Sequence, residues 1–234
     1  DLHLCDRRQR QMCIRDRGLE KNRYFIVSCH REENVDYTGN LRKIILFLAD
    51  NIGSSVSISS IGNTLINEGL LDDGKRKGAP SAHTVQAYVN ALLESYFFYE
   101  IKRFDIKGKR ILETQEKYYL SDLGLRHAVI GYRDNDIAGV LENTVFLELL
   151  RRGFSVNIGK QDVAEVDFVA NRADDRLYIQ VCYILTPENT DREFAPLEAI
   201  SDNYEKLVLS TDTLLRVNRG GIRQKNIIDF LLEH

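Results

Sequence analysis

The sequence is poor in cysteine and has no long apolar run. Only Cys29 and Cys182 lie outside residues 1–17, and no short spacing joins them. This usage excludes a disulfide framework and a cysteine-based zinc site, and it is typical of a reducing cytoplasm. No apolar run approaches the roughly 18 residues that a membrane-spanning helix needs. We therefore expect a cytoplasmic protein with no membrane partner.

A phosphate-binding loop is also missing. No Gly-x-x-x-x-Gly-Lys-Ser/Thr pattern, whose backbone N–H groups would cradle nucleotide phosphates, occurs in the 234 residues. We therefore expect no cofactor in this fragment, and no residue here can be assigned to ATP binding. The formal net charge of −3 argues against a general nucleic-acid-binding surface, although a local basic patch is compatible with it.

The first residues are dense in arginine without the apolar core of a targeting peptide. The stretch Arg7–Arg17 resembles the translation of a transposase-type sequencing adapter, so we expect residues 1–17 to be an artefact. The alternative is a basic arm that binds nucleic acid. Because Met12 is the only methionine, we expect the natural start of the gene to lie upstream. Residues 18–39 are then expected to be the remnant of a preceding ATPase domain.

Residues 40–130 carry three helical patterns followed by two alternating strands, Tyr99–Phe104 and Ile111–Tyr119. Three helices and a hairpin in this order predict a winged helix-turn-helix, whose third helix enters the major groove and whose wing contacts the backbone. The positions expected to face inward are Leu41, Ile44, Ile45, Leu48 and Ala49 in the first helix, Ile61 and Leu65 in the second, and Val85, Tyr88, Val89, Leu92 and Leu93 in the third.

Duplex DNA is one partner that this interpretation predicts. Glutamine and asparagine can pair with adenine, and threonine or alanine can touch a thymine methyl group. Basic residues on the wing suit contacts to phosphate. The alternative is a winged helix that only packs against a protein or self-associates. The predicted DNA-contacting residues are His83, Thr84, Gln86, Ala87 and Asn90 on the third helix and Lys107, Lys109 and Arg110 on the wing.

A short helix follows the hairpin. The second unit is expected at residues 131–234 and begins with a polar boundary at residues 131–139. Asp122 is expected to be the N-cap of that helix, with Leu123, Leu125 and Ala128 packing inward. The later residues predict a helix at 140–152, strands near 154–158, 165–171 and 177–184, a helix at 190–200, a strand at Lys206–Ser210 and an apolar closing segment. A Thr190-x-x-Glu193 capping box is expected at 190. This order predicts an α/β (α+β) fold with a mixed sheet flanked by helices.

Three segments of the second unit carry polar residues in a specific layout. Glu142 lies on the helix, Asp167 on a strand, and Gln180-x-Cys182 on the next strand. This layout resembles the PD-(D/E)XK, or restriction-endonuclease-like, fold, in which two carboxylates and a lysine converge on a divalent metal and a phosphate. The resemblance implies that Glu142 and Asp167 hold the metal, and that Gln180 and Cys182 stand where an active nuclease has Glu and Lys.

The two replacements predict a degenerate catalytic site. A neutral carbonyl is a weaker ligand for a hard cation, and a thiol cannot replace an ammonium. Glu165 could add an oxygen ligand, and Lys160 is the nearby lysine that could take the missing role. In purely structural roles, Glu142 would pair with Arg151 or Lys160, and Asp167 would cap a turn. We therefore expect no nuclease activity; a metal-dependent DNA nuclease is the alternative.

The order of several segments resembles a family of prokaryotic AAA-type ATPases with an uncharacterised C-terminal domain. Members look like an N-terminal P-loop ATPase, then a winged helix, then a nuclease-like domain. The resemblance implies an upstream domain that binds ATP and Mg²⁺, and a non-catalytic region here that binds DNA or protein. An architectural oligomerisation module is a further alternative. The segments are Leu141–Gly153, Gly159-Lys160, Glu165–Ala170, Tyr178–Val181, Asp191–Glu193 and Asp202–Lys206.

Overall fold

The computed structural model describes residues 35–67, 82–213 and 217–233. Within these ranges the protein is a mixed α/β fold built on one nine-stranded sheet in the order β1-β3-β2-β4-β5-β6-β7-β9-β8. The expectations for residues 1–17 and for most of 18–39 concern residues outside these ranges. No helix of the described ranges is long and apolar enough to cross a membrane.

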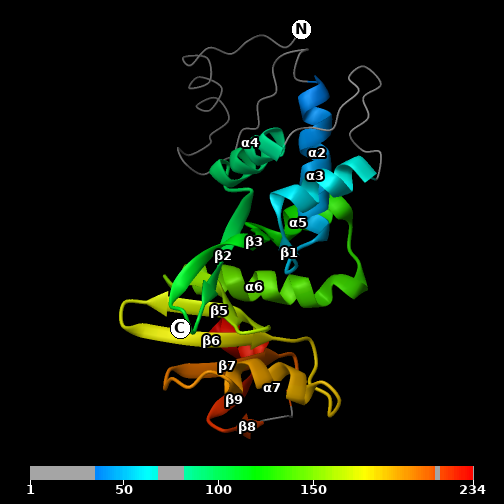
Figure 1. Cartoon of the computed structure of the whole chain (residues 1–234). Helices are drawn as coiled ribbons and strands as arrows, with labels where there is room; N and C mark the ends of the chain where they lie inside the picture. Colours follow the sequence, from blue (N-terminus) through cyan, green and yellow to red (C-terminus); the bar gives the residue numbers. More distant parts are fainter. Residues whose placement is uncertain (1–34, 68–81, 214–216, 234) are drawn as a thin grey trace, which may run out of the picture.

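Three helices and a hairpin form the N-terminal half (Figure 1). The predicted inward stripes are buried: Ile44, Leu48 and Ala49, then Ile61 and Leu65, then Val85, Val89 and Leu92. They pack together with Phe98 and Tyr118 from the hairpin. The first helix begins five residues before the predicted Asn40, where the sequence shows no apolar period. The elements are α2 (Val35–Asp50), β1 (Ser55–Val56), α3 (Ile58–Asn67), α4 (Ala82–Glu94), β2 (Phe98–Asp105) and β3 (Arg110–Leu120).

The helix α5 (Leu123–Ile130) begins where the sequence predicted but buries a different face. The Asp122 carboxylate accepts a hydrogen bond from the Leu125 N–H at 3.0 Å, which confirms it as the N-cap. Leu125 and Ala128 are exposed, so the inward face predicted for them was wrong. Arg126 is fully buried instead, because its guanidinium donates to the Ala49 carbonyl at 3.0 Å and pairs with Asp136 at 2.5 Å.

The C-terminal half places helices on both faces of the sheet, as predicted. Phe146 and Leu149 of α6 and Phe230 of α8 pack on one face, and Phe194 and Leu197 of α7 pack on the other. The elements are η2 (Asp134–Asp136), α6 (Ile137–Arg151), β4 (Ser155–Gln161), β5 (Ala164–Arg172), β6 (Asp175–Val181), α7 (Thr190–Glu198), β7 (Glu205–Ser210), β8 (Asn218–Arg219), β9 (Ile222–Asn226) and α8 (Ile227–Leu232).

The capping box predicted for α7 was wrong. Asn189, not Thr190, is the N-cap residue. The Thr190 hydroxyl donates to the Thr186 carbonyl at 2.7 Å, and the buried Glu193 side chain pairs with Arg192 at 2.6 Å. The pattern failed because Glu193 has a partner within the fold that competes with the helix terminus.

The two halves share the sheet through strands β2 and β4, which lie parallel (Figure 1). The register runs from Arg103 opposite Ile158 to Asp105 opposite Lys160. Ile106, directly after β2, is buried against Val166 and Val169 of the C-terminal sheet. The hairpin of the N-terminal half is therefore part of the C-terminal sheet, an arrangement that the sequence did not predict.

Candidate functional site

An open cleft of about 860 Å³ lies between α6 and α7, where β5 begins and β6 ends. All four residues that the sequence assigned to the degenerate site line it, namely Glu142, Asp167, Gln180 and Cys182. The other charged residues in its wall are Glu165, Glu193 and Arg192. The fold thus brings the predicted carboxylates together from two separate elements, α6 and β5.

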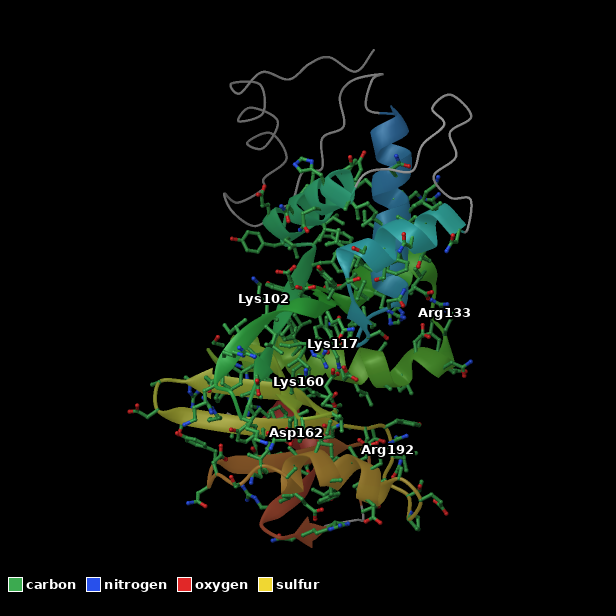
Figure 2. All side chains as sticks on the ribbon, viewed as in Figure 1. Lys102, Lys117, Arg133, Lys160, Asp162 and Arg192 are labelled. Carbon is green, nitrogen blue, oxygen red and sulfur yellow. The ribbon has the colours of Figure 1, made fainter. Side chains whose placement is uncertain are left out.

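A lysine from the other half of the protein contacts three carboxyl groups that line this cleft. The Lys117 ammonium is 2.9 Å from Glu165 Oε1, 3.3 Å from Glu142 Oε2 and 3.5 Å from Asp167 Oδ1. Its side chain is only 4% exposed. Figure 2 shows Lys117 beside α6, and Lys160 further along over the C-terminal sheet. The lysine that meets the carboxylates is therefore Lys117 and not Lys160.

The strand geometry of β3 directs Lys117 into the cluster. Residues two apart in a strand share a face, so Lys117 and Tyr119 point the same way. The Tyr119 hydroxyl donates to Glu142 Oε2 at 2.8 Å, and its ring stacks on Phe146 with centroids 5.1 Å apart. The tyrosine thus anchors β3 against α6 and holds Lys117 beside the carboxyl groups.

Burial controls the protonation of the cluster. Burial, reinforced by the Asp167 charge, raises the pKa of Glu142 to about 8 although Lys117 opposes the shift. Burial likewise raises the pKa of Asp167, again against Lys117. Burial disfavours the charged form of Lys117, yet the combined charges of Asp167, Glu142 and Glu165 outweigh it and raise its pKa. Because the pKa of Glu142 is raised to about 8, this carboxyl group retains its proton near neutral pH.

The polar groups of β6 are engaged in bonds that hold the strand. Gln180 Oε1 accepts from the Asp167 N–H at 3.3 Å, and its Nε2 donates to Glu193 Oε2 at 3.3 Å. Asp167 Oδ2 accepts from the Val181 N–H at 2.9 Å, which ties β5 to β6. Burial, with the charges of Glu193 and Asp212, raises the pKa of Cys182 to about 12. The thiol stays protonated, so it supplies neither a ligand nor a cation.

The structural partners that the sequence suggested for Glu142 are engaged elsewhere or lie apart. Arg151 pairs with Glu148 at 2.7 Å, and no ion pair of the described residues joins Lys160 to Glu142. Asp167 does cap backbone, as suggested, but the backbone belongs to the neighbouring strand. The sequence gives no clear signal for Lys117, because Glu113 and Glu116 are also charged residues between Ile111 and Leu120.

The residues predicted to contact DNA fall into two separate places. On α4, His83, Ala87 and Asn90 are exposed, whereas Thr84 and Gln86 are half-buried. Gln86 donates to Asn90 Oδ1 at 2.8 Å, and α4 carries no lysine or arginine.

The predicted wing residues lie at the far end of β2. Lys107 pairs with Asp162 at 3.4 Å, and Arg110 lies 3.9 Å from Asp105. The side chains of Lys107 and Arg110 are largely exposed. Lys109 adopts a left-handed φ of 52° in the turn. Because the eight residues of β2 separate α4 from this turn, the structure does not bring the two sets onto one face (Figure 1). The hairpin tip lies at the level of β5, away from α4.

No group of three or more His, Cys, Asp or Glu side chains arranged to hold a metal ion occurs in the part of the chain that the structure describes. The cleft is instead a buried ion cluster in an α/β protein, with a lysine among carboxyl groups.

Comparisons place this chain among proteins whose roles are not described. Residues 22–136 match a family model described as a domain of unknown function (DUF8612). The chain is 42% identical over 193 residues to an uncharacterised protein of Haemophilus influenzae, covering 82% of this chain and 46% of that protein. It is 32% identical over 182 residues to uncharacterised protein MJ1544 of Methanocaldococcus jannaschii, covering 76% and 38%. The chain spans less than half the length of these curated relatives.

Among solved structures, this chain has a weak likeness to protein VC1899 from Vibrio cholerae. Its crystal structure aligns with a TM-score of 0.27 and 12% sequence identity, over 82% of this chain and 53% of that one. This likeness is too low to support an argument about the fold or the site.

Proposed function

We propose that this chain is a non-catalytic binding region of a larger AAA-type ATP-binding protein, built from a winged helix-turn-helix and a restriction-endonuclease-like unit. The order of α2, α3, α4 and the β2–β3 hairpin supports the first unit. Glu142 on α6 beside Asp167 on β5 supports the second. ATP and Mg²⁺ belong, in this proposal, to an upstream domain, for which the greater length of the relatives leaves room.

The absence of catalysis rests on two side chains, Gln180 in β6 and Cys182 directly after it. A metal nuclease needs an oxygen ligand and usually a lysine on this strand to support the attacking water. Gln180 has both ends of its amide engaged, and Cys182 is a buried neutral thiol. These two side chains support a structural role for the strand.

The incorporation of the hairpin into the C-terminal sheet is the observation that carries the proposed mode of binding. A DNA-binding wing must be free to contact the backbone beside the recognition helix. Here β2 pairs with β4, Ile106 is buried, and the wing cations lie far from α4. The winged helix is therefore a packing module whose exposed α4 face, with His83, Ala87 and Asn90, binds a protein partner or a second copy.

Binding to duplex DNA at 50 and 200 mM salt tests this proposal. A protein that neutralises several phosphates loses orders of magnitude in affinity over this range. We expect only weak binding, unchanged by Lys107→Glu/Lys109→Glu. The matched control is Arg223→Glu/Lys225→Glu on β9, which makes the same charge change at the other end of the sheet. Tight binding that depends on salt and is lost only in the first variant would establish DNA as the partner instead.

A plasmid-nicking assay with Mg²⁺ or Mn²⁺ tests the absence of catalysis. We expect no nicking at high protein concentration, in either the wild type or Asp167→Ala. Metal-dependent nicking by the wild type that Asp167→Ala abolishes would show that the protein is a nuclease. Light scattering on the purified protein tests self-association, which would raise the measured mass above that of one chain.

A further inference from the structure

The carboxyl groups of the cleft are those that a nuclease-like fold would use for a divalent metal. Such an ion needs oxygen ligands that converge on one point with free lone pairs. Glu142, Glu165 and Asp167 converge, but the point on which they converge is Lys117 Nζ, at 3.3, 2.9 and 3.5 Å. The residues present therefore fit an ammonium better than a metal.

The number of donors matches the number of acceptors. An ammonium carries three N–H donors and no acceptor. Three carboxyl groups surround Lys117, one from α6 and two from β5. Each donor can point at a separate carboxyl group, and the three ion pairs compensate a charge whose side chain is only 4% exposed.

Two oxygens that Lys117 does not contact, and Glu142 Oε2, which it does contact, also accept from other donors. Glu165 Oε2 accepts from Arg103 at 3.1 Å, Asp167 Oδ2 from the Val181 N–H at 2.9 Å, and Glu142 Oε2 from the Tyr119 hydroxyl at 2.8 Å. A divalent ion bonded to these oxygens would lie within a few ångströms of the ammonium and would be repelled by it. A metal would therefore compete with Lys117 for the same oxygens.

We propose that the Lys117 ammonium is the resident cation of this cleft, taking the position of a divalent metal and cross-linking the N-terminal hairpin to α6 and β5. The inference rests on the proposed function in one respect, that the cleft is nuclease-like. It adds that the cleft holds the two halves of the protein together.

The elements around Lys117 support the cross-link. Lys117 belongs to β3, and it lies opposite Ser55 in the antiparallel pairing of β3 with β1. Gly53, between α2 and β1, lies so close that a Cβ there would be 2.9 Å from Glu142 Oε2. Lys117 of β3 and Arg103 of β2 therefore contact the carboxyl cluster of the C-terminal half, and Gly53 lies beside it. Removal of one partner of a buried pair leaves uncompensated charge and is strongly destabilising.

Thermal unfolding of Lys117→Met with and without Mn²⁺ tests the proposal. We expect the melting temperature to fall by about 10 °C, because like charges remain buried without a counter-ion. Mn²⁺ should then bind the vacated carboxyl groups and restore most of the loss in a saturable way. Wild-type stability should not respond to Mn²⁺, and neither should Lys117→Met/Asp167→Asn. The matched control is Lys160→Met, a half-buried lysine outside the cluster, which should cost little and gain no response.

Two measurements on the wild-type protein test whether Lys117 takes the position of a metal ion, even if Lys117→Met does not fold. Titration followed by the paramagnetic resonance of free Mn²⁺ should show no tight site. A proton–nitrogen spectrum of lysine ammonium groups should show one slowly exchanging signal that Lys160→Met retains. A stoichiometric Mn²⁺ site in the wild type, lost in Asp167→Asn, would overturn the proposal. Such binding without DNA cleavage would leave the non-catalytic function standing, whereas cleavage would overturn that function as well.

Discussion

Lys117 and Glu142 show that a single side chain in this protein depends on partners far along the chain. The two residues are 25 positions apart, yet the ammonium and the carboxyl oxygen lie 3.3 Å from each other. Desolvation alone would strongly disfavour both charged groups, and their mutual contact offsets part of that cost. At the residue scale, the protonation of the cluster and the space around it are the properties that experiments can probe.

The raised pKa of Glu142 predicts that stability depends on pH. The folded carboxyl group, with a pKa of about 8, holds a proton that the unfolded chain releases near its ordinary value of 4.5. Its contribution is therefore fully present below about pH 4.5 and is lost as pH rises to about 8. We expect the free energy of unfolding to fall by on the order of a few kcal/mol between pH 5 and 8. The shift at Asp167 acts in the same direction.

Urea unfolding at several pH values between 5 and 8 provides the measurement. Glu142→Gln keeps the shape and an acceptor for Tyr119 but cannot titrate, so its stability should vary much less with pH. Equal slopes in the two proteins would contradict the assignment to Glu142.

Gly53 makes a second prediction at this scale. It has a left-handed φ of 74°, and an added Cβ would lie 2.9 Å from Glu142 Oε2. We expect Gly53→Ala to lose about 2 kcal/mol, from backbone strain and from displacement of the carboxyl group. Gly153→Ala is the control, because its φ of 79° is similar but no atom lies within 4 Å. It should lose about 1 kcal/mol from strain alone. Equal losses, measured by urea unfolding, would show that the contact with Glu142 is unimportant.

At the element scale, ends and faces of helices were set by polar side chains. Ser57 and Ser60 cap α3 reciprocally, with bonds of 3.0 and 3.1 Å between each N–H and the other hydroxyl. Asp122 caps α5, whereas Arg126 is buried on the face of α5 that leaves Leu125 exposed. A cap can be read from neighbouring residues, but a buried arginine requires partners that only the packed structure supplies.

The cap of α5 gives the prediction at this scale. Loss of an N-cap side chain leaves a helix N–H without an acceptor and typically costs about 1 kcal/mol. We expect Asp122→Ala to lower the free energy of unfolding by this amount. Asp122→Asn retains an acceptor oxygen and should cost only a few tenths of that, roughly 0.3 kcal/mol. Circular dichroism during urea unfolding would measure both, and equal losses would point to a charge effect rather than capping.

At the scale of the whole molecule, one sheet joins two halves that the sequence predicted as separate domains. The pairing of β2 with β4 and the Lys117 cluster both cross the predicted boundary. Gly159 lies at this junction, where an added Cβ would be 2.9 Å from Val166 Cβ and Val169 Cγ2 and 3.0 Å from Ile106 Cδ1. The halves should therefore unfold together in one transition.

Gly159→Ala tests this coupling. Overpacking of a core junction costs about 1–3 kcal/mol, and here it should weaken the β2–β4 pairing first. We expect a lower unfolding midpoint and faster amide hydrogen exchange in β2 and β4. Gly62→Ala is the control, since its nearest neighbour, Val85 Cγ2, would be 3.8 Å away. Alanine also favours its helix, so this control should change stability little. Unchanged exchange in Gly159→Ala would contradict a coupling through this contact.

The sequence by itself determined most of the helices and strands and their order, because a periodic apolar pattern is a local property of the chain. It also determined which carboxyl groups gather, since Glu142 and Asp167 lie in elements whose layout resembles a known one. It misassigned the lysine, the start of α7 and the inward face of α5. Lys117 and Arg126 followed partners distant in sequence, whereas at α7 Glu193 paired with the adjacent Arg192 instead of the helix terminus.

Only the tertiary structure decided that β2 joins β4, that the β2–β3 turn lies away from α4, and that Lys117 contacts the carboxyl groups of the cleft. Parallel pairing connects strands distant in sequence and leaves no local signature. The position of a buried ammonium is likewise fixed by whichever oxygens satisfy its three donors, and these come from α6 and β5 after the halves have packed.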